Sequence, residues 1–222
     1  MTDIAKGAST LAPTLSAIRR DIHQHPELSF QEHRTAGKIA ETLERVGIEV
    51  RRNVAGTGVV GILHGSGEGP VTALRADMDA LPIEEQTGAE YASRNRGVMH
   101  ACGHDVHTTC LLGAMLLLAE RREKLTGDVK CIFQPAEEIN KGAKALMEED
   151  VLNDPPVDAI FGLHTAPKIP AGKIGVKAGP LMAAVDTIAL SIHGEGGHGA
   201  VPDRTRDAIV AAGAVIQNLQ TV

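Results

Sequence analysis

The sequence predicts an α/β fold in which a mainly parallel sheet is sandwiched by helices. Short apolar runs rich in Val, Ile and Leu alternate along the chain with segments of helical periodicity. Hydrophobic residues make up 43% of the 222 residues and are mostly aliphatic, which is enough to fill a substantial core. Strands that alternate with helices are typical of parallel sheets, because parallel neighbours need a crossover connection.

Two amphipathic helices are expected first, and strands follow them. Apolar side chains recur at helical spacing over residues 11–22 and 36–46, and Gly47 is suited to end the second helix. The expected strands are residues 48–52, 58–63, 71–75, 129–133 and 159–163. These apolar runs are expected to be buried.

Two more helices are predicted between the later strands. Residues 105–120 are apolar nearly all round, so this helix should be buried. Pro135 suits the first turn of a helix, so we expect a helix there that also contains Leu146.

A domain boundary is predicted near Gly179, which divides the chain into residues 1–182 and 183–222. Residues 186–193 alternate apolar and polar side chains like a half-exposed strand, and a helix is expected from about Thr205. One strand and one helix cannot bury their apolar faces alone. The second domain is therefore expected to be truncated.

Composition excludes several classes of function. The net charge is −6, the pI is near 5.9 and the 22 basic residues are dispersed, which argues against nucleic-acid binding. The longest apolar stretch, residues 110–119, is too short to span a membrane, and the polar N-terminus lacks a secretory signal. Three cysteines fit a reducing compartment. We expect a cytoplasmic protein.

Potential metal ligands lie next to three of the predicted strands. They are Cys102 and His104, the pair Glu137 and Glu138, and His164. Each has an ordinary explanation by itself: a helix N-terminus, an acidic first helical turn, or a structural histidine. Ligands in open α/β sheets gather at the carboxyl ends of strands, so the three segments together favour a transition-metal site and metal-assisted hydrolysis.

Adjacent carboxylates can divide two tasks. One of Glu137 and Glu138 can bind metal while the other faces substrate and water as a base, because a carboxylate occupied by a metal is a poor proton acceptor. Asp77 and Asp79 could bind metal directly or orient a ligand imidazole through a hydrogen bond. His198, in a glycine-rich turn, could donate to developing oxyanion charge.

These residues stand in six motifs that resemble the metal-dependent amidohydrolases of the aminoacylase and carboxypeptidase superfamily. The most similar subgroup contains the hippurate hydrolases (N-acyl-L-amino acid amidohydrolases) and the auxin-conjugate hydrolases. The matching segments are Ile18–Glu27, Leu74–Pro82, Met99–Asp105, Phe133–Glu138, Phe161–His164 and Gly196–Pro202. Asp77-Met78-Asp79 and Cys102 replace a His-x-Asp motif and an Asp found in other branches, which is the pattern of this subgroup.

The resemblance implies a role for each site residue. Cys102, His104, Glu138 and His164 would bind two divalent metal ions (zinc, manganese, cobalt or nickel), with Cys102 as the bridge. Glu137 would be the general base and acid.

The resemblance also implies a role for the second domain. His198 would be the histidine of a lid domain that polarises the scissile carbonyl. In related enzymes this histidine often comes from the partner subunit of a homodimer. Thr165-Ala166 replaces an Asn-Trp pair of many relatives.

By resemblance, residues 1–182 would be the N-terminal part of a zinc-peptidase-like catalytic domain. Residues 183–222 would begin a ferredoxin-like α+β lid and dimerisation domain. The implied reaction is hydrolysis of the amide bond of small N-acyl amino acids.

Two alternatives stay open. Cys102 could be a metal-independent nucleophile activated by His104, which would survive a chelator but not an alkylating agent. The chain could also be a non-catalytic metal- or peptide-binding fragment, which would bind metal without turnover.

Overall fold

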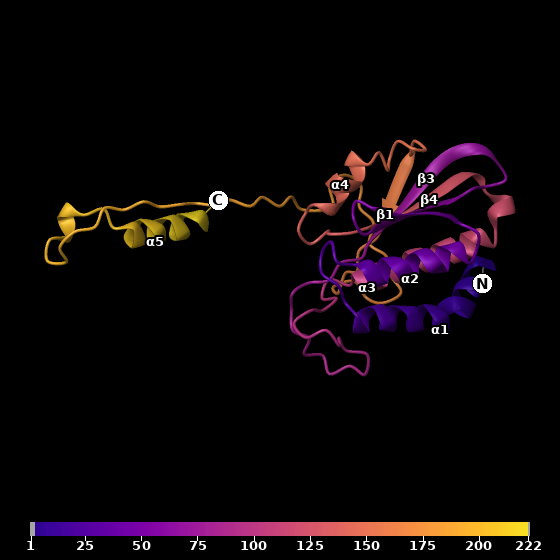
Figure 1. Ribbon diagram of the computed structural model, residues 1–222, viewed down its shortest axis with the longest axis horizontal. Coiled ribbons are helices and arrows are strands. Elements are labelled where there is room, and N and C mark those ends of the chain that lie inside the picture. The colour runs from indigo at the N-terminus through magenta and orange to yellow at the C-terminus, as the bar shows by residue number, and fades with distance from the viewer. Residues whose placement is uncertain (1–2, 222) are drawn as a thin grey trace. The chain divides into compact units, whose positions relative to one another are not determined.

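The computed structural model describes residues 3–221, and these divide after Pro170 into two compact units (Figure 1). This division falls before the boundary that we predicted between residues 182 and 183. The first unit contains, in chain order, α1 (Asp3–Gln24), α2 (His33–Glu44), β1 (Glu49–Val54), β2 (Gly58–Leu63), β3 (Gly67–Asp77), α3 (His104–Ala119), a 3-10 turn (Arg122–Lys124), β4 (Thr126–Gln134), α4 (Gly142–Glu148) and β5 (Ala159–Gly162). The second contains a 3-10 turn (Pro202–Arg204) and α5 (Ala208–Leu219).

The sheet is mixed rather than mainly parallel. Its strand order is β1-β2-β4-β3-β5. β3 runs parallel to β4 and to β5, whereas β2 is antiparallel to both β1 and β4. The connection between β1 and β2 is residues 55–57, which is long enough for a hairpin but too short for a parallel crossover.

Helices lie on both faces of this sheet. Neighbouring residues of β2, Val59 and Val60, belong to different cores because successive side chains of a strand point to opposite faces. Val59 packs in the core that contains residues of α2 and α3, and Val60 packs with Leu146 of α4. Figure 1 shows α1, α2 and α3 on one side of the sheet and α4 on the other.

α1 packs closely on α3 at a glycine. A Cβ added to Gly113 would lie 2.7 Å from Leu15 Cδ1, so the Leu15 side chain would have to move to admit a larger residue. This packing holds α3 against the sheet, and α3 begins at a residue of the candidate site.

Two sequence predictions in the first unit are wrong in detail. The helix after Pro135 begins only at Gly142, because Ala136 adopts a left-handed conformation with φ of 49° and residues 137–140 form a turn. β5 is exposed rather than buried, and Phe161 keeps 60% of its surface accessible. β5 pairs only with β3 among the described strands, so it is an edge strand.

The predicted strand over residues 186–193 is also absent from the described part of the second unit. That segment is irregular, and the pairing nearby is a single bridge between Glu195 and Arg206. The predicted helix is confirmed as α5, which starts at Ala208 because the Asp207 side chain accepts hydrogen bonds from two backbone N–H groups of its first turn.

None of the described helices is both long enough and apolar enough to cross a membrane.

A buried lysine fastens the connection between α4 and β5. Lys130 of β4 is fully buried. Its Nζ donates to the backbone carbonyls of Val151, Asp154 and Pro155 at 2.6, 3.0 and 2.7 Å. Lys130 thus holds the loop that leads into β5.

We expect Lys130→Met to lower the free energy of unfolding by about 1–3 kcal/mol, because buried carbonyls would lose their donor. The measurement is urea denaturation followed by circular dichroism. Lys144→Met is the matched control, since the Lys144 side chain is 77% exposed, and it should change stability by less than about 0.5 kcal/mol. Equal denaturation midpoints for the two variants would contradict this role.

Candidate metal centre

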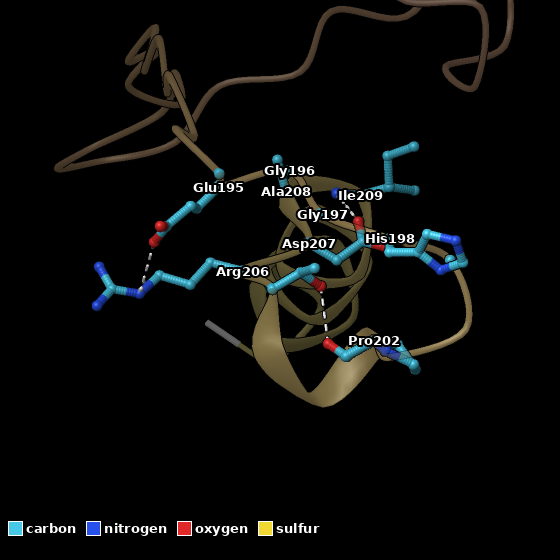
Figure 2. Close-up of a pocket in the computed structure, with 12 residues that line it drawn as sticks. Glu195, Gly196, Gly197, His198, Pro202, Arg206, Asp207, Ala208 and Ile209 are labelled. Atoms are coloured by element: carbon cyan, nitrogen blue, oxygen red, sulfur yellow. Dashed lines mark hydrogen bonds and ion pairs between the residues drawn. The ribbon is translucent and has the colours of Figure 1, made fainter.

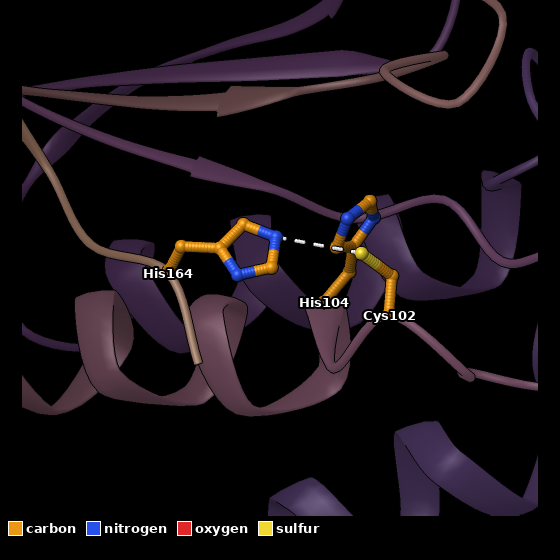
Figure 3. Close-up of side chains that lie close together, drawn as sticks. All are labelled: Cys102, His104 and His164. Atoms are coloured by element: carbon orange, nitrogen blue, oxygen red, sulfur yellow. Dashed lines mark hydrogen bonds between the residues drawn. The ribbon is translucent and has the colours of Figure 1, made fainter. Parts of the chain in front are cut away.

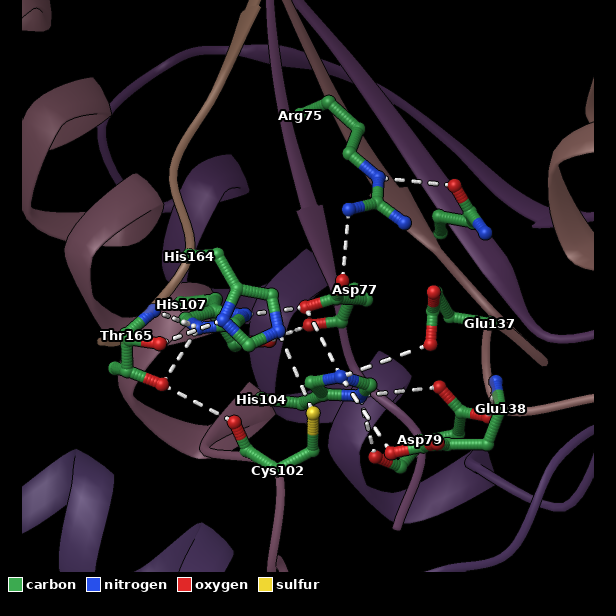
Figure 4. A network of polar contacts seen from close by, with 12 residues as sticks. Arg75, Asp77, Asp79, Cys102, His104, His107, Glu137, Glu138, His164 and Thr165 are labelled. Carbon is green, nitrogen blue, oxygen red and sulfur yellow. Dashed lines mark hydrogen bonds and ion pairs between the residues drawn. The ribbon is translucent and has the colours of Figure 1, made fainter. Parts of the chain in front are cut away.

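The carboxyl ends of the parallel strands β3, β4 and β5 bring the candidate residues together (Figure 4). Asp77 ends β3, Glu137 and Glu138 follow β4, and His164 follows β5. His104 is the first residue of α3. Topology alone therefore gathers side chains that are far apart in the sequence.

Cys102 and His104 turn toward one point because a glycine separates them. Gly103 has a φ of 89°, and a Cβ there would lie 2.6 Å from Thr165 Oγ1. Cys102 Sγ lies 3.4 Å from His164 Nε2 (Figure 3). One ligand atom from each of Cys102, His104 and His164 lies within 4.8 Å of the other two. A single cation could contact all three.

The two ring nitrogens of the fully buried His104 have different environments. Nδ1 lies 2.8 Å from the backbone carbonyl oxygen of Asp79, which can only accept, so Nδ1 carries the hydrogen. In the neutral ring Nε2 then keeps its lone pair, and it has no hydrogen-bond partner among the described residues. Burial lowers the pKa of His104, but the Asp79 and Asp77 carboxylates outweigh this effect and raise it. Glu138 Oε1, 3.7 Å from His104 Nε2, is also buried and unpaired within residues 3–221. Buried polar atoms are normally paired, so these two fit a cation between them.

The adjacent acids differ in exposure, as their predicted division of tasks requires. The side chain of Glu138 is 17% exposed and that of Glu137 is 39% exposed. Glu137 Oε2 lies 3.9 Å from His104 Nε2, and ligand atoms of these three residues again lie within 4.8 Å of one another. The predicted ligands therefore meet in two groups that share His104.

The two aspartates after β3 make different contacts. Asp79 accepts from His104 through its backbone carbonyl and from the backbone N–H of Glu138 through Oδ2 at 3.0 Å. Asp77 accepts from His107 Nδ1 at 2.6 Å and from Arg75 Nη1 at 2.7 Å. Burial opposes ionisation of Asp77, but the hydrogen bond from His107 and the nearby positive charges lower its pKa to about 2.

His107 belongs to this site, although sequence analysis did not assign it a role. It is fully buried, and its Nε2 accepts the backbone N–H of Thr165 at 2.9 Å. The Thr165 hydroxyl in turn donates to the carbonyl of Cys102 at 3.1 Å. His107 follows His104 by three residues and so lies on the same helical face, which is the signal that could have identified it.

His164 lies in an exposed segment, and its ring orientation is set locally. Nδ1 lies 2.7 Å from the Thr165 carbonyl oxygen, so Nδ1 donates and Nε2 keeps its lone pair toward Cys102. Both His104 and His164 thus present an Nε2 lone pair to the same region. This is the state in which imidazole binds a metal.

The charge of the site favours a cation over a free thiolate. Burial and the neighbouring carboxylates of Glu138 and Asp77 raise the pKa of Cys102 to about 12. Burial also raises the pKa of Glu138, and the charge of Glu137 acts in the same direction. Each of these anions is stabilised when a divalent ion enters.

His198 lies in the second unit, in a glycine-rich turn beside the start of α5 (Figure 2). Its side chain is exposed, and its Nδ1 accepts the backbone N–H of Ala200 at 3.1 Å. His198, Pro202 and Arg206 are among the residues that line an open hollow in this unit. Its catalytic role stays a prediction.

Comparison with known proteins agrees with this geometry. The model of peptidase family M20/M25/M40 matches residues 73–221. The chain belongs to this family. It is 52% identical over 206 residues to an N-acetylcysteine deacetylase of Bacillus subtilis, an alignment that covers 92% of this chain and 54% of the relative. It is 46% identical over 208 residues to an N-acyl-L-amino acid amidohydrolase of Geobacillus stearothermophilus, covering 93% and 55%.

Solved structures of the M20 family are similar as well. The crystal structure of a dinuclear metal-binding M20 peptidase from Bacillus subtilis matches with a TM-score of 0.75 and 51% identity, over 78% of this chain and 48% of that one. The membership expected from the six motifs is therefore confirmed. This M20 chain spans about half the length of the curated relatives that it matches.

We expect the metal-free Cys102 thiol of this M20 chain to stay protonated at neutral pH, because its pKa is raised to about 12. Its alkylation rate, measured by peptide mass spectrometry in a Cys110→Ser background with a chelator present, should keep rising far above the ordinary thiol pKa of about 8.5. A small model thiol is the control, and its rate should level off once it is ionised. If the alkylation rate of Cys102 levels off at the same pH as that of the model thiol, or at a lower pH, the result would contradict the geometry and favour a nucleophilic thiolate.

Proposed function

We propose that this chain carries the metal centre and general base of an amidohydrolase that cleaves the amide bond of small N-acyl amino acids. One observation carries the proposal. Among the described residues, the buried atoms His104 Nε2 and Glu138 Oε1 have no hydrogen-bond partner, and the more exposed Glu137 lies beside them. The names of the relatives, an N-acetylcysteine deacetylase and an N-acyl-L-amino acid amidohydrolase, support this substrate class.

Cys102, His104, Glu138 and His164 would hold two divalent ions. Thiolate, imidazole and carboxylate together suit zinc, manganese, cobalt or nickel. His104 Nε2 has one lone pair and would bind only one ion, whereas a thiolate or a carboxylate has several, and the family resemblance makes Cys102 the expected bridge. When bound, such ions act as Lewis acids that polarise a carbonyl and lower the pKa of water.

The remaining chemistry falls to side chains that hold or move protons. Glu137 accepts a proton from the attacking water and returns it to the leaving nitrogen, so that an amide and water become a carboxylate and an amine. His198 donates a hydrogen bond to the carbonyl oxygen as negative charge develops there. Asp79 keeps the His104 ring oriented through the bond at Nδ1.

The metal-independent alternative has less support. Cys102 lies within hydrogen-bond distance of His164 rather than of His104, the base that this alternative assigned to it. Carboxylates around the thiol also raise its pKa, which opposes the thiolate that a nucleophile requires. A metal-binding protein without turnover is the outcome that the following experiments would reveal.

For the whole protein we also propose a cytoplasmic location and a homodimer formed through a lid domain that includes the second unit. Cys102, Cys110 and Cys131 are free thiols, which supports a reducing compartment. Apolar side chains of α5 are exposed in the second unit, among them Ile209 at 83% and Val210 at 69%, and these would be covered in a larger assembly.

Glu137→Gln should lower turnover of an N-acyl amino acid about 10²- to 10⁴-fold, because a general base is lost, and should leave the bound metal nearly unchanged. Turnover and elemental analysis are measured on this chain and on any longer form of the protein. Glu148→Gln, an exposed glutamate of α4, is the control and should leave both unchanged. Metal loss that parallels the activity loss would contradict the role of Glu137 as a base.

His198→Ala should lower turnover about 10²-fold, as expected for the loss of one oxyanion donor, without changing metal content. The assay uses the same forms of the protein as for Glu137→Gln, and His193→Ala, at another exposed histidine of the second unit, is the matched control. If the two variants have equal turnover, His198 has no special part in the reaction.

A further inference from the structure

Glu32 is a buried acid whose side chain does not serve its own helix. It is fully buried and occupies the position just before α2, yet its carboxylate makes no capping hydrogen bond. That task falls to Glu27, which accepts the backbone N–H groups of Arg34 and Thr35 at 2.9 and 2.8 Å. The Glu32 carboxylate is therefore available for contacts elsewhere.

One of those contacts lies at the turn that carries Glu137 and Glu138, and the other lies at Thr57 in the connection between β1 and β2. Glu32 Oε1 accepts the backbone N–H of Ala136 at 2.9 Å, and Oε2 accepts the hydroxyl of Thr57. Ala136 directly precedes Glu137 and Glu138, is buried, and has a φ of 49°. Residues with a Cβ rarely adopt this left-handed conformation, so it needs support from its surroundings.

The same turn is held at its other end by a second carboxylate. Asp79 Oδ2 accepts the backbone N–H of Glu138 at 3.0 Å and the hydroxyl of Ser29 at 2.7 Å. The backbone on both sides of Glu137 is thus fixed by acids from other segments, Glu32 before it and Asp79 after it. We call this pair of contacts the turn clamp.

Glu32 is costly to bury, which argues against a purely stabilising role. Burial raises its pKa, and the hydrogen bonds that oppose this shift come from neutral groups. No cation pairs with it among the described residues. A buried carboxyl without a charged partner lowers stability. The hydrogen bond from the Ala136 N–H explains the position of Glu32 better.

We propose that Glu32 is a positioning residue that fixes the Glu137-Glu138 turn in the conformation that presents both carboxylates to the metal centre. This inference rests on the proposed function of those two acids. The essential property of Glu32 is the reach of its acceptor oxygen to the Ala136 N–H. Its negative charge is not required, because an amide oxygen accepts the same bond.

Two variants separate reach from charge. Glu32→Gln keeps the length of the side chain and an acceptor oxygen but removes the charge. Glu32→Asp keeps the charge but shortens the side chain by one methylene, so its oxygens lie farther from the Ala136 N–H. Glu27→Asp is the matched control, because it shortens the other acid at the start of α2, which does not contact the turn.

The first readout is cobalt(II) affinity, measured by titration calorimetry together with the cobalt–thiolate absorption of Cys102. We expect wild-type affinity for Glu32→Gln and Glu27→Asp. Glu32→Asp should lose about 10- to 100-fold in affinity for an ion bound by Glu138, which is the usual effect of losing a group that orients a ligand. Wild-type affinity in Glu32→Asp, or equal losses in Glu32→Gln and Glu32→Asp, would overturn the proposal.

The second readout does not depend on metal. Hydrogen exchange of a peptide spanning residues 134–141 should accelerate in metal-free Glu32→Asp but not in Glu32→Gln. If the wild-type chain binds no cobalt, the proposed function fails while this measurement still tests the turn clamp. Unchanged exchange in Glu32→Asp would refute the clamp by itself.

Discussion

The hydrogen bond from His104 Nδ1 to the Asp79 carbonyl determines what His104 can do. A carbonyl cannot donate, so this bond fixes the tautomer and leaves a lone pair on Nε2. The opposite tautomer would make Nε2 a hydrogen-bond donor, which could not bind a metal ion as predicted. The sheet sets the position of that carbonyl: Met78 N–H donates to Gln134 O at 3.1 Å, which continues the β3–β4 pairing beyond Asp77.

A second constraint is the concentration of negative charge around one imidazole. Asp77, Asp79, Glu137 and Glu138 all approach His104. Arg75 forms an ion pair with Asp77 and, among the described residues, with none of the other three acids. Like charges at this spacing repel each other in a partly buried site. The arrangement is therefore complementary to positive charge, and of the four acids Asp79 is held by a backbone N–H group and a hydroxyl, whereas Asp77 is held by His107 and Arg75.

The helices and most strands of the first unit could be predicted from periodicity, because apolar spacing reports burial directly. α3, β2 and β4 were predicted within a few residues. The turn at Ala136 was missed, since Pro135 favours a helical first turn and no local signal revealed that Glu32, far away in the chain, holds Ala136 in a left-handed conformation.

Residues 186–193 alternate like a strand, but alternation forms a strand only when a partner strand pairs with it. The clustering of Cys102, His104, Glu138 and His164 could be predicted because these residue types stand at strand ends, while their role as metal ligands stays a prediction. His107 was left without a role because its contacts with Asp77 and Thr165 are long-range.

The open side of β5 has a consequence for how copies of the chain interact. Within the described residues this strand offers a row of unpaired backbone groups flanked by the exposed Ile160, Phe161 and Leu163. Such an exposed edge is a template with which a strand of another chain can pair. An uncovered β5 edge would therefore favour association between copies of the chain, next to the predicted metal ligand His164.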